Sequence, residues 1–139
     1  MATITIGLNC KLYRGPAGAT AAQEVKNVKD VTLNLEVTEE DATTREGAGW
    51  ETPEPILFRA SIDFEMNWKT SDPNFTALQQ AFFAKSAIAI AALDGPGGQG
   101  FDFDAKVFKF TRTEPVAGIV KVAVTVKPVY VTRAPNWKT

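Results

Sequence analysis

Hydrophobic and polar positions alternate most strictly between residues 58 and 69. The apolar row is Phe58, Ala60, Ile62, Phe64, Met66 and Trp68, and the polar row is Arg59, Ser61, Asp63, Glu65, Asn67 and Lys69. A period of two is typical of a β-strand that is buried on one face and wet on the other. At about 3.3 Å per residue the strand would be roughly 35–40 Å long, which is unusual in a small domain.

Other segments predict strands of the same kind. Residues 31–37 place Val31, Leu33, Leu35 and Val37 inward, residues 120–126 carry valines at every even position, and residues 86–93 form a shorter apolar strand. Between residues 101 and 110 the apolar phase shifts from odd to even positions, which predicts a β-bulge at Val107 and Phe108.

Residues 72–85 predict an α-helix. Asp72 is a good N-cap, and Pro73 fits the first helical position, where its missing N–H costs nothing. Phe75, Leu78 and Phe82 follow at helical spacing and form an apolar stripe. The patterns together predict a mainly β protein: an antiparallel β-sandwich or rolled β-barrel with one packed α-helix and a long extended loop.

Composition narrows the class of protein. A length of 139 residues fits a single domain over 1–139, and a net charge of −1 argues against a general nucleic-acid binder. No apolar run approaches 20 residues, so no membrane span is expected, and one cysteine excludes an internal disulfide. The chain has no histidine, which removes the commonest general base and the commonest transition-metal ligand. We therefore expect that the protein binds no cofactor or metal and that it is not an enzyme.

Two pairs of carboxylates could in principle carry acid–base chemistry. Asp63 with Glu65, and Asp102 with Asp104, each lie two residues apart on a predicted strand. We interpret both pairs as solvated strand faces, because Arg59 and Lys69 share the face of the first pair and no pocket is implied. The glycine-rich stretch 95–100 lacks the lysine and hydroxyl residue of a phosphate-binding loop and predicts a hairpin turn.

An acidic segment, Thr38–Pro55, interrupts the strands. It holds six acids against one arginine, a formal charge of −5, and a lone tryptophan, Trp50. Fixing eighteen residues costs about 20–30 kcal/mol of conformational entropy, which its few apolar side chains cannot offset. Loops of this length are uncommon in compact domains unless they have a function. We expect a neighbouring molecule to order this segment, with Trp50 as its aromatic anchor.

The order of these segments resembles that of phage major tail tube proteins, and of the related tubes of tailocins and contractile injection systems. The likeness covers about residues 27–128 and includes an acidic, threonine-rich loop followed by glycine and tryptophan. It implies a non-catalytic subunit that forms hexameric rings, which stack into a hollow tube for the passage of DNA or an effector. In that family the sheets of neighbouring subunits join into one barrel around the lumen, and the long loop reaches the adjacent ring.

The resemblance also implies partners and places. The partners would be further copies of the chain, with tape measure, sheath, baseplate and tail terminator proteins, and DNA only transiently in the lumen. The location would be a virion tail or injection-system tube assembled in the bacterial cytoplasm. Residues 38–55 would be the inter-subunit loop and residues 128–139 a C-terminal tail. The sequence does not separate a phage tail from a tailocin or an injection system.

Three sets of candidate site residues follow. The inter-ring loop interface comprises Glu39, Glu40, Asp41, Thr43, Thr44, Arg45, Gly49 and Trp50. The last 29 residues carry a formal charge of +4, so the basic partner of the loop would be Arg112, Lys121, Lys127 and Arg133. The lumen-facing candidates are Thr32, Asn34, Glu36, Ser61, Asp63, Glu65 and Asn67. The alternative function is a monomeric β-sandwich binding module of the carbohydrate or adhesin type.

Overall fold

The computed structural model describes residues 4–130 and 133–138. Its strands are β1 (Lys11–Pro16), β2 (Gln23–Glu24), β3 (Val28–Asp41), β4 (Pro53–Asn67), β5 (Ile88–Leu93), β6 (Gly100–Thr113), β7 (Lys121–Pro128) and β8 (Asn136–Lys138). The α-helix α1 spans Pro73–Ala84, and short 3-10 turns lie at Gly7–Asn9 and Arg45–Gly47. The predicted mainly β class with a packed α-helix is confirmed. No helix in the described part of the chain combines the length and hydropathy that crossing a bilayer takes.

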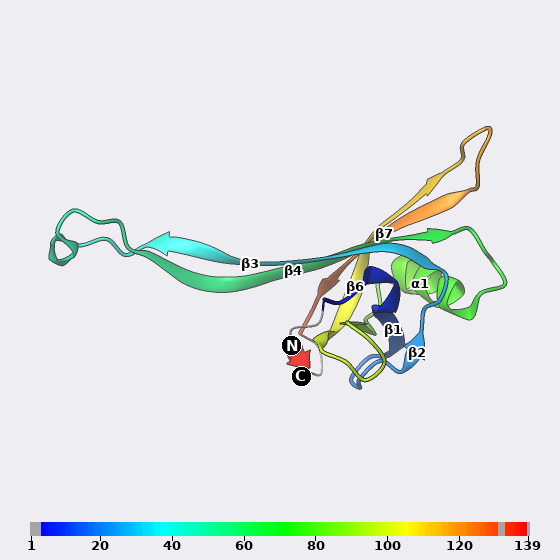
Figure 1. The fold of residues 1–139 in the computed structure, drawn as a ribbon, viewed down its shortest axis with the longest axis horizontal. Helices are drawn as coiled ribbons and strands as arrows, with labels where there is room; N and C mark the ends of the chain where they lie inside the picture. The colour runs from blue at the N-terminus through cyan, green and yellow to red at the C-terminus, as the bar shows by residue number, and fades with distance from the viewer. Residues whose placement is uncertain (1–3, 131–132, 139) are drawn as a thin grey trace.

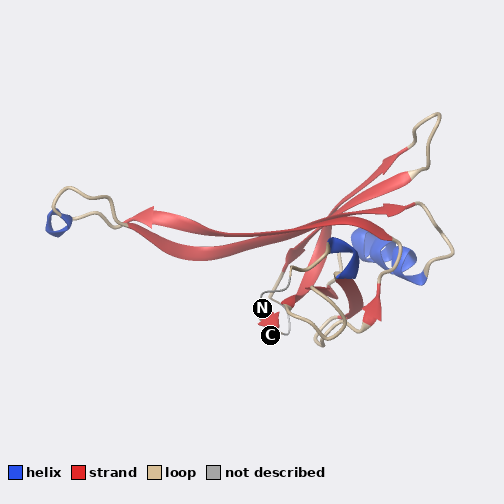
Figure 2. Cartoon of the chain, viewed as in Figure 1, coloured by secondary structure: helices blue, strands red, loops and turns tan. Residues whose placement is uncertain are grey.

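The strands form one antiparallel sheet in the order β2-β1-β5-β6-β7-β4-β3, with β8 paired to β6. Over the described residues this path is open, so the sheet that they form is not closed into a barrel. The sheet bends around α1 at one end of the molecule, while β3 and β4 run on together as a long ribbon away from it (Figure 2). Both chain ends of the drawn ribbon lie near the body, far from the tip of that ribbon (Figure 1).

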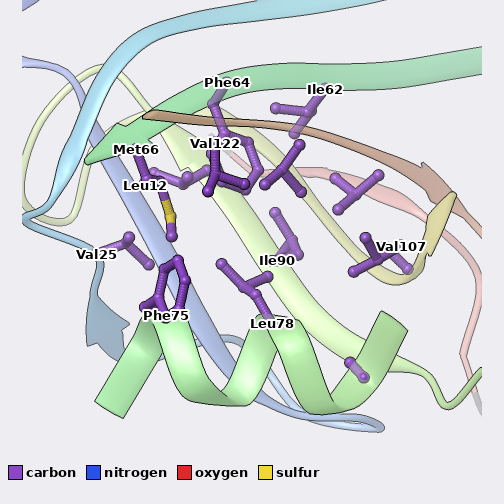
Figure 3. Close-up of a cluster of buried hydrophobic side chains, with 14 of the residues drawn as sticks. Leu12, Val25, Ile62, Phe64, Met66, Phe75, Leu78, Ile90, Val107 and Val122 are labelled. Carbon is purple, nitrogen blue, oxygen red and sulfur yellow. The ribbon is translucent and has the colours of Figure 1, made fainter. Parts of the chain in front are cut away.

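The core lies between α1 and the bent sheet. Phe75 and Leu78 of the helix point toward side chains from several strands (Figure 3). Their strand partners include Leu12, Ile62, Phe64, Met66, Ile90, Phe103, Val122, Val124 and Val126. In the part of β4 beside the body, Ile62, Phe64 and Met66 thus face the core, as their period predicts, and the odd-numbered residues between them face away from it.

Two local predictions are confirmed. The side chain of Asp72 caps α1 by accepting a hydrogen bond from the Asn74 N–H at 3.1 Å, and Pro73 occupies the first turn. The pairing of β6 with β7 shifts register between Val107 and Lys109, which is the predicted β-bulge. Both features depend on short-range sequence alone.

The interpretation of Asp102 and Asp104 as a solvated pair is wrong. Asp104 is fully buried and Asp102 nearly so, on the sheet face opposite α1. The Arg133 guanidinium donates from Nε to Asp104 at 2.9 Å and from Nη2 to Asp102 at 3.0 Å. The backbone N–H of Gly18 also donates to Asp104, and the hydroxyl of Thr20 donates to Asp102; we call this buried cluster the arginine clamp. The bond to Asp102 raises the pKa of Arg133, so the guanidinium stays charged.

The arginine clamp fixes the C-terminal segment to the body. Just beyond Arg133, β8 pairs with β6 through Gly100–Lys138, Phe101–Trp137 and Asp102–Asn136. Part of the predicted C-terminal tail, residues 128–139, is therefore sheet; Val131, Thr132 and Thr139 lie outside the described residues. The sequence gives no sign of this, because the carboxylates and the arginine lie about 30 residues apart.

Candidate functional site: a projecting hairpin

The most distinctive feature of the molecule is the hairpin of β3 and β4. Strand β7 supports β4 only from Asn67 to Ile62, so residues 53–61 of β4 pair with β3 alone. Nine residues of strand correspond to roughly 30 Å. The hairpin therefore projects far beyond the body, as the cyan and green ribbon of Figure 1 shows. Strands reach Asp41 and resume at Pro53, so only residues 42–52 of the predicted acidic segment lie outside them.

One face of the projecting hairpin is apolar and uncovered. Leu35 lies opposite Ala60, and Val37 lies opposite Phe58, so their side chains share the face that packs on the core nearer the body. The sequence places all of them inward, yet Phe58 is 91% exposed and Leu35 is 53% exposed. Val37 is also exposed, because the body ends before the hairpin does. The described residues of the chain therefore leave this row of apolar side chains in water.

The tip of the hairpin, residues 42–52, is closed by its own hydrogen bonds. Ala42 N–H donates to the Thr52 carbonyl at 2.9 Å, and Thr52 N–H donates to the Thr43 hydroxyl oxygen at 2.9 Å. The Thr43 hydroxyl and N–H both donate to Asp41, and these bonds lower the pKa of that carboxyl. Gly49 has a φ of +94°, a conformation that a residue with a Cβ rarely adopts.

The predicted loop interface lies together at this end of the hairpin. Glu39, Glu40 and Asp41 end β3, and Thr43, Thr44, Arg45, Gly49 and Trp50 form the tip. Trp50 is 78% exposed, and its ring contacts no other aromatic ring among the described residues. The arrangement is an exposed aromatic side chain at the end of a long two-stranded ribbon whose last turns carry several carboxylates.

The seven predicted lumen residues share one face of the sheet, opposite α1. Asn34 Nδ2 donates to Ser61 Oγ at 3.3 Å and to Asp63 Oδ2 at 3.1 Å. The Thr125 hydroxyl donates to the other oxygen of Asp63 at 2.6 Å, and Lys121 Nζ lies 3.7 Å from Glu65 Oε1. Thr32, Glu36 and Asn67 are in phase with this network. We call this hydrogen-bonded surface of β3, β4, β7 and β6 the polar face.

The four cations predicted as a docking surface do not lie together. Arg133 belongs to the arginine clamp, and Lys127 lies on the polar face with its Nζ 5.5 Å from the centre of the Phe108 ring. The Cζ atom of Arg112 lies 4.8 Å from the centre of the Trp68 ring, and its Nη2 lies 3.2 Å from Glu114 Oε1. Lys121 pairs with Glu65. Each of the four already has a partner in its own chain.

Two long strand edges lack a partner among residues 4–130 and 133–138. Strand β3 pairs with β4 on one side, and its other side is open along Val28–Asp41. Strand β6 pairs with β5 only up to Ala105, so residues 106–113 are open on that side. These edges bound the four-stranded part β3-β4-β7-β6 that carries the polar face. Open edges of this length invite pairing with another chain.

A hollow of about 680 Å³ lies between the base of the hairpin and the C-terminal segment. It is mostly apolar, and Phe58, Phe101, Tyr130 and Trp137 contribute aromatic rings to its wall. Trp137 Nε1 donates to the Gln99 side chain at 3.0 Å, so its polar end is occupied. Sequence reasoning missed this hollow, because its walls come from four separate segments of the chain.

No protein-family model matches the chain, and no curated protein matches it in sequence. Solved structures match it closely in fold. The tail of an empty GTA particle, refined with C6 symmetry, gives a TM-score of 0.81 at 14% identity over 98% of this chain and 100% of that chain. The SPP1 tail tube gives a TM-score of 0.72 at 12% identity, over 89% of this chain and 75% of that chain. The sixfold-symmetrised baseplate of the anti-feeding prophage gives a TM-score of 0.61 at 10% identity, over 99% of this chain and 97% of that chain.

At these identities the likeness establishes the fold, which is that of tail tube proteins. The fold predicted from the resemblance is confirmed. The match with the GTA tail covers nearly all of this chain and all of that chain, so the projecting hairpin belongs to the shared architecture.

Proposed function

We propose that the chain is a structural tail tube subunit that assembles into hexameric rings, and that these rings stack into a hollow tube for DNA or an effector. The role is structural and not catalytic. The likeness to tail structures supports it, and the sequence offers neither histidine nor a thiol cluster for chemistry. Whether the particle is a phage tail, a tailocin or an injection system depends on its other components.

The uncovered apolar face of the projecting hairpin is the observation that carries this proposal. A ribbon about 30 Å long cannot bury its apolar row against its own body. Exposing Phe58, Leu35 and Val37 costs about 1.5–3 kcal/mol for each side chain that could be buried instead. Soluble monomers rarely expose a contiguous row of this kind. A neighbouring copy that covers the row removes this cost.

The open edges provide the ring contact. In the proposed ring, the β3 edge of one copy pairs with residues 106–113 of β6 in the next copy. Each copy then contributes four strands to a continuous barrel, and closure removes the open edges altogether. The polar face lines the inside of that barrel, because α1 and the core occupy its other side.

The polar face suits a passage for a polyanion. On this face Glu36 lies opposite Arg59, and Lys121 Nζ lies 3.7 Å from Glu65 Oε1, while Lys127 lies opposite Lys106. Basic side chains on phosphates would hold DNA in place, and nearby carboxylates reduce that attraction. Arg59, Lys121 and Lys127 all lie on the polar face.

Electron microscopy of the purified full chain at increasing concentration tests this proposal. Negatively stained samples are expected to contain rings and then tubes with a visible channel. Analytical ultracentrifugation of the same samples is expected to show monomers converting to large species. A chain that stays monomeric at millimolar concentration would contradict the proposal.

The alternative, a monomeric binding module, has one observation in its favour. The hollow with Phe58, Phe101, Tyr130 and Trp137 is concave and aromatic, as sugar-binding surfaces are. The concentration series distinguishes the two functions, because a binding module remains monomeric. Tubes whose walls cover Phe58 would assign the hollow to assembly.

A further inference from the structure

We infer that the acidic tip of each hairpin docks on a lysine surface at the opposite end of another copy. This lysine surface consists of Lys26, Lys29 and Lys69. The inference rests on the proposed stacking of rings. The lysine surface takes the place of the C-terminal cations as the acceptor of the tip. Three features of the molecule support it: the tip and the lysines lie at opposite ends of the same strands, the charged groups differ in whether they already have partners, and two hollows lie between the lysines.

The two surfaces lie at opposite ends of the same strands. At the tip, Asp41 pairs with Pro53; at the other end, Val28 pairs with Met66 and Asn67 pairs with Lys121. The fifteen residues of β4 between these ends span roughly 45 Å. A head-to-tail stack therefore brings the tip of one copy to the far end of the next, a contact that propagates into a filament.

Three segments meet at this far end and hold the lysines close together. Asn27 Nδ2 donates to the Asn67 carbonyl at 2.8 Å, which ties the start of β3 to the end of β4. Asn74 Nδ2 donates to the Glu24 carbonyl at 3.1 Å, which ties the start of α1 to β2. Lys26 stands between these two ties.

Two small hollows flank Lys26. One of about 380 Å³ separates it from Lys69, and one of about 170 Å³ separates it from Lys29. All three lysines are exposed, and none pairs with an acid among the described residues. The surface is thus a cluster of available ammonium groups around shallow polar depressions.

The acids of this end are less available than its lysines. Glu24 lies 3.7 Å from Lys11, and the Asp72 carboxylate caps α1. Asp30 is the exposed acid beside Lys29. Counting Lys26, Lys29, Lys69 and Asp30, the exposed surface carries a formal charge of +2.

The tip has the complementary character. Glu39, Glu40, Glu46, Glu51 and Glu54 are exposed, and none of them pairs with a described cation. Arg112 and Lys121 also lie near the far end, but Glu114 and Glu65 already neutralise them. Charge complementarity therefore favours the lysine surface over the C-terminal cations as the acceptor.

A charge-swap experiment tests the docking. The variant Lys26→Glu/Lys69→Glu reverses the two lysines on either side of the larger hollow. The variant Lys85→Glu/Lys138→Glu changes the net charge equally at sites away from it and serves as the matched control. Tube yield is measured by electron microscopy and by pelleting at fixed protein concentration.

The lysine-surface variant is expected to give at least about tenfold fewer tubes while rings persist, since the contact repeats around every ring. Adding Glu46→Lys/Glu51→Lys at the tip is expected to restore tubes. Wild-type tube yield is expected to fall between 0.1 and 1 M salt, where the Debye length shrinks from about 10 to 3 Å. The control variant is expected to match the wild type.

Tubes at wild-type yield from the lysine-surface variant would overturn the docking and leave the tube function intact. Failure of the tip reversal to restore tubes would overturn it as well. A wild-type chain that forms neither rings nor tubes would contradict the proposed function itself. Rings without stacking in the variant, together with restoration by the tip reversal, would support both.

Discussion

Replacing residues 38–57 by an Asn-Gly turn is expected to abolish tube formation and to leave a folded chain. The truncation joins Val37 to Phe58, which lie opposite each other in the hairpin, and a two-residue Asn-Gly turn suits such a connection. It removes the tip, Trp50 and most of the projecting ribbon. The exposed side chains Leu35, Val37 and Phe58 are kept, but the acidic tip is lost, so one copy can no longer reach the next ring.

The body should survive this truncation. Ile62, Phe64 and Met66, the residues of β4 in the core, all lie in the part that is kept. Circular dichroism and thermal unfolding of the variant are expected to resemble those of dilute wild-type protein. Tubes from the truncated chain at wild-type concentration would show that the hairpin is not the assembling element.

Arg133→Met is expected to lower the free energy of unfolding by about 3–5 kcal/mol. The substitution keeps an unbranched side chain but leaves two buried carboxylates, Asp102 and Asp104, without their guanidinium partner. Removing the cation from a buried ion pair is costly, and Arg133 contacts two buried carboxylates here. A domain of this size has about 5–15 kcal/mol of stability in total, so the loss is large. Urea titration of dilute monomer measures it.

Lys127→Met is the matched control, because it removes an exposed cation with no buried partner. Its effect is expected to stay within about 0.5 kcal/mol. Adding Asp102→Asn to Arg133→Met is expected to recover part of the loss by removing one buried charge. A loss below about 1 kcal/mol for Arg133→Met would show that the clamp does not hold the C-terminal segment in place.

The features that the sequence predicts well are those set by neighbouring residues. The Asp72 cap, the bulge at Val107 and the two faces of β4 each depend on a few consecutive side chains. These preferences act at short range, and tertiary packing agrees with them here. The same alternation also predicts that the polar residues of β3 and β4 share one face of the sheet.

The features that the sequence does not reveal depend on contacts between distant segments. Alternating Phe and Asp in residues 101–104 is a proper pattern for a half-exposed strand. It gives no sign that residues 17–22 and Arg133 cover the Asp face. Likewise, the apolar row of β3 and β4 predicts burial but not the molecule that provides it. The lysine surface is hidden for the same reason, since Lys69 lies about 40 residues from Lys26 and Lys29.

Hydrogen–deuterium exchange of residues 28–61 in dilute monomer and in assembled protein tests most directly whether other copies cover the hairpin. Backbone amides of the projecting ribbon are expected to exchange quickly in the monomer, where residues 53–61 pair with β3 alone. In tubes the same amides are expected to slow by orders of magnitude, and the core strands to change little. Equal exchange of the ribbon in both states would contradict the assignment of the hairpin to assembly.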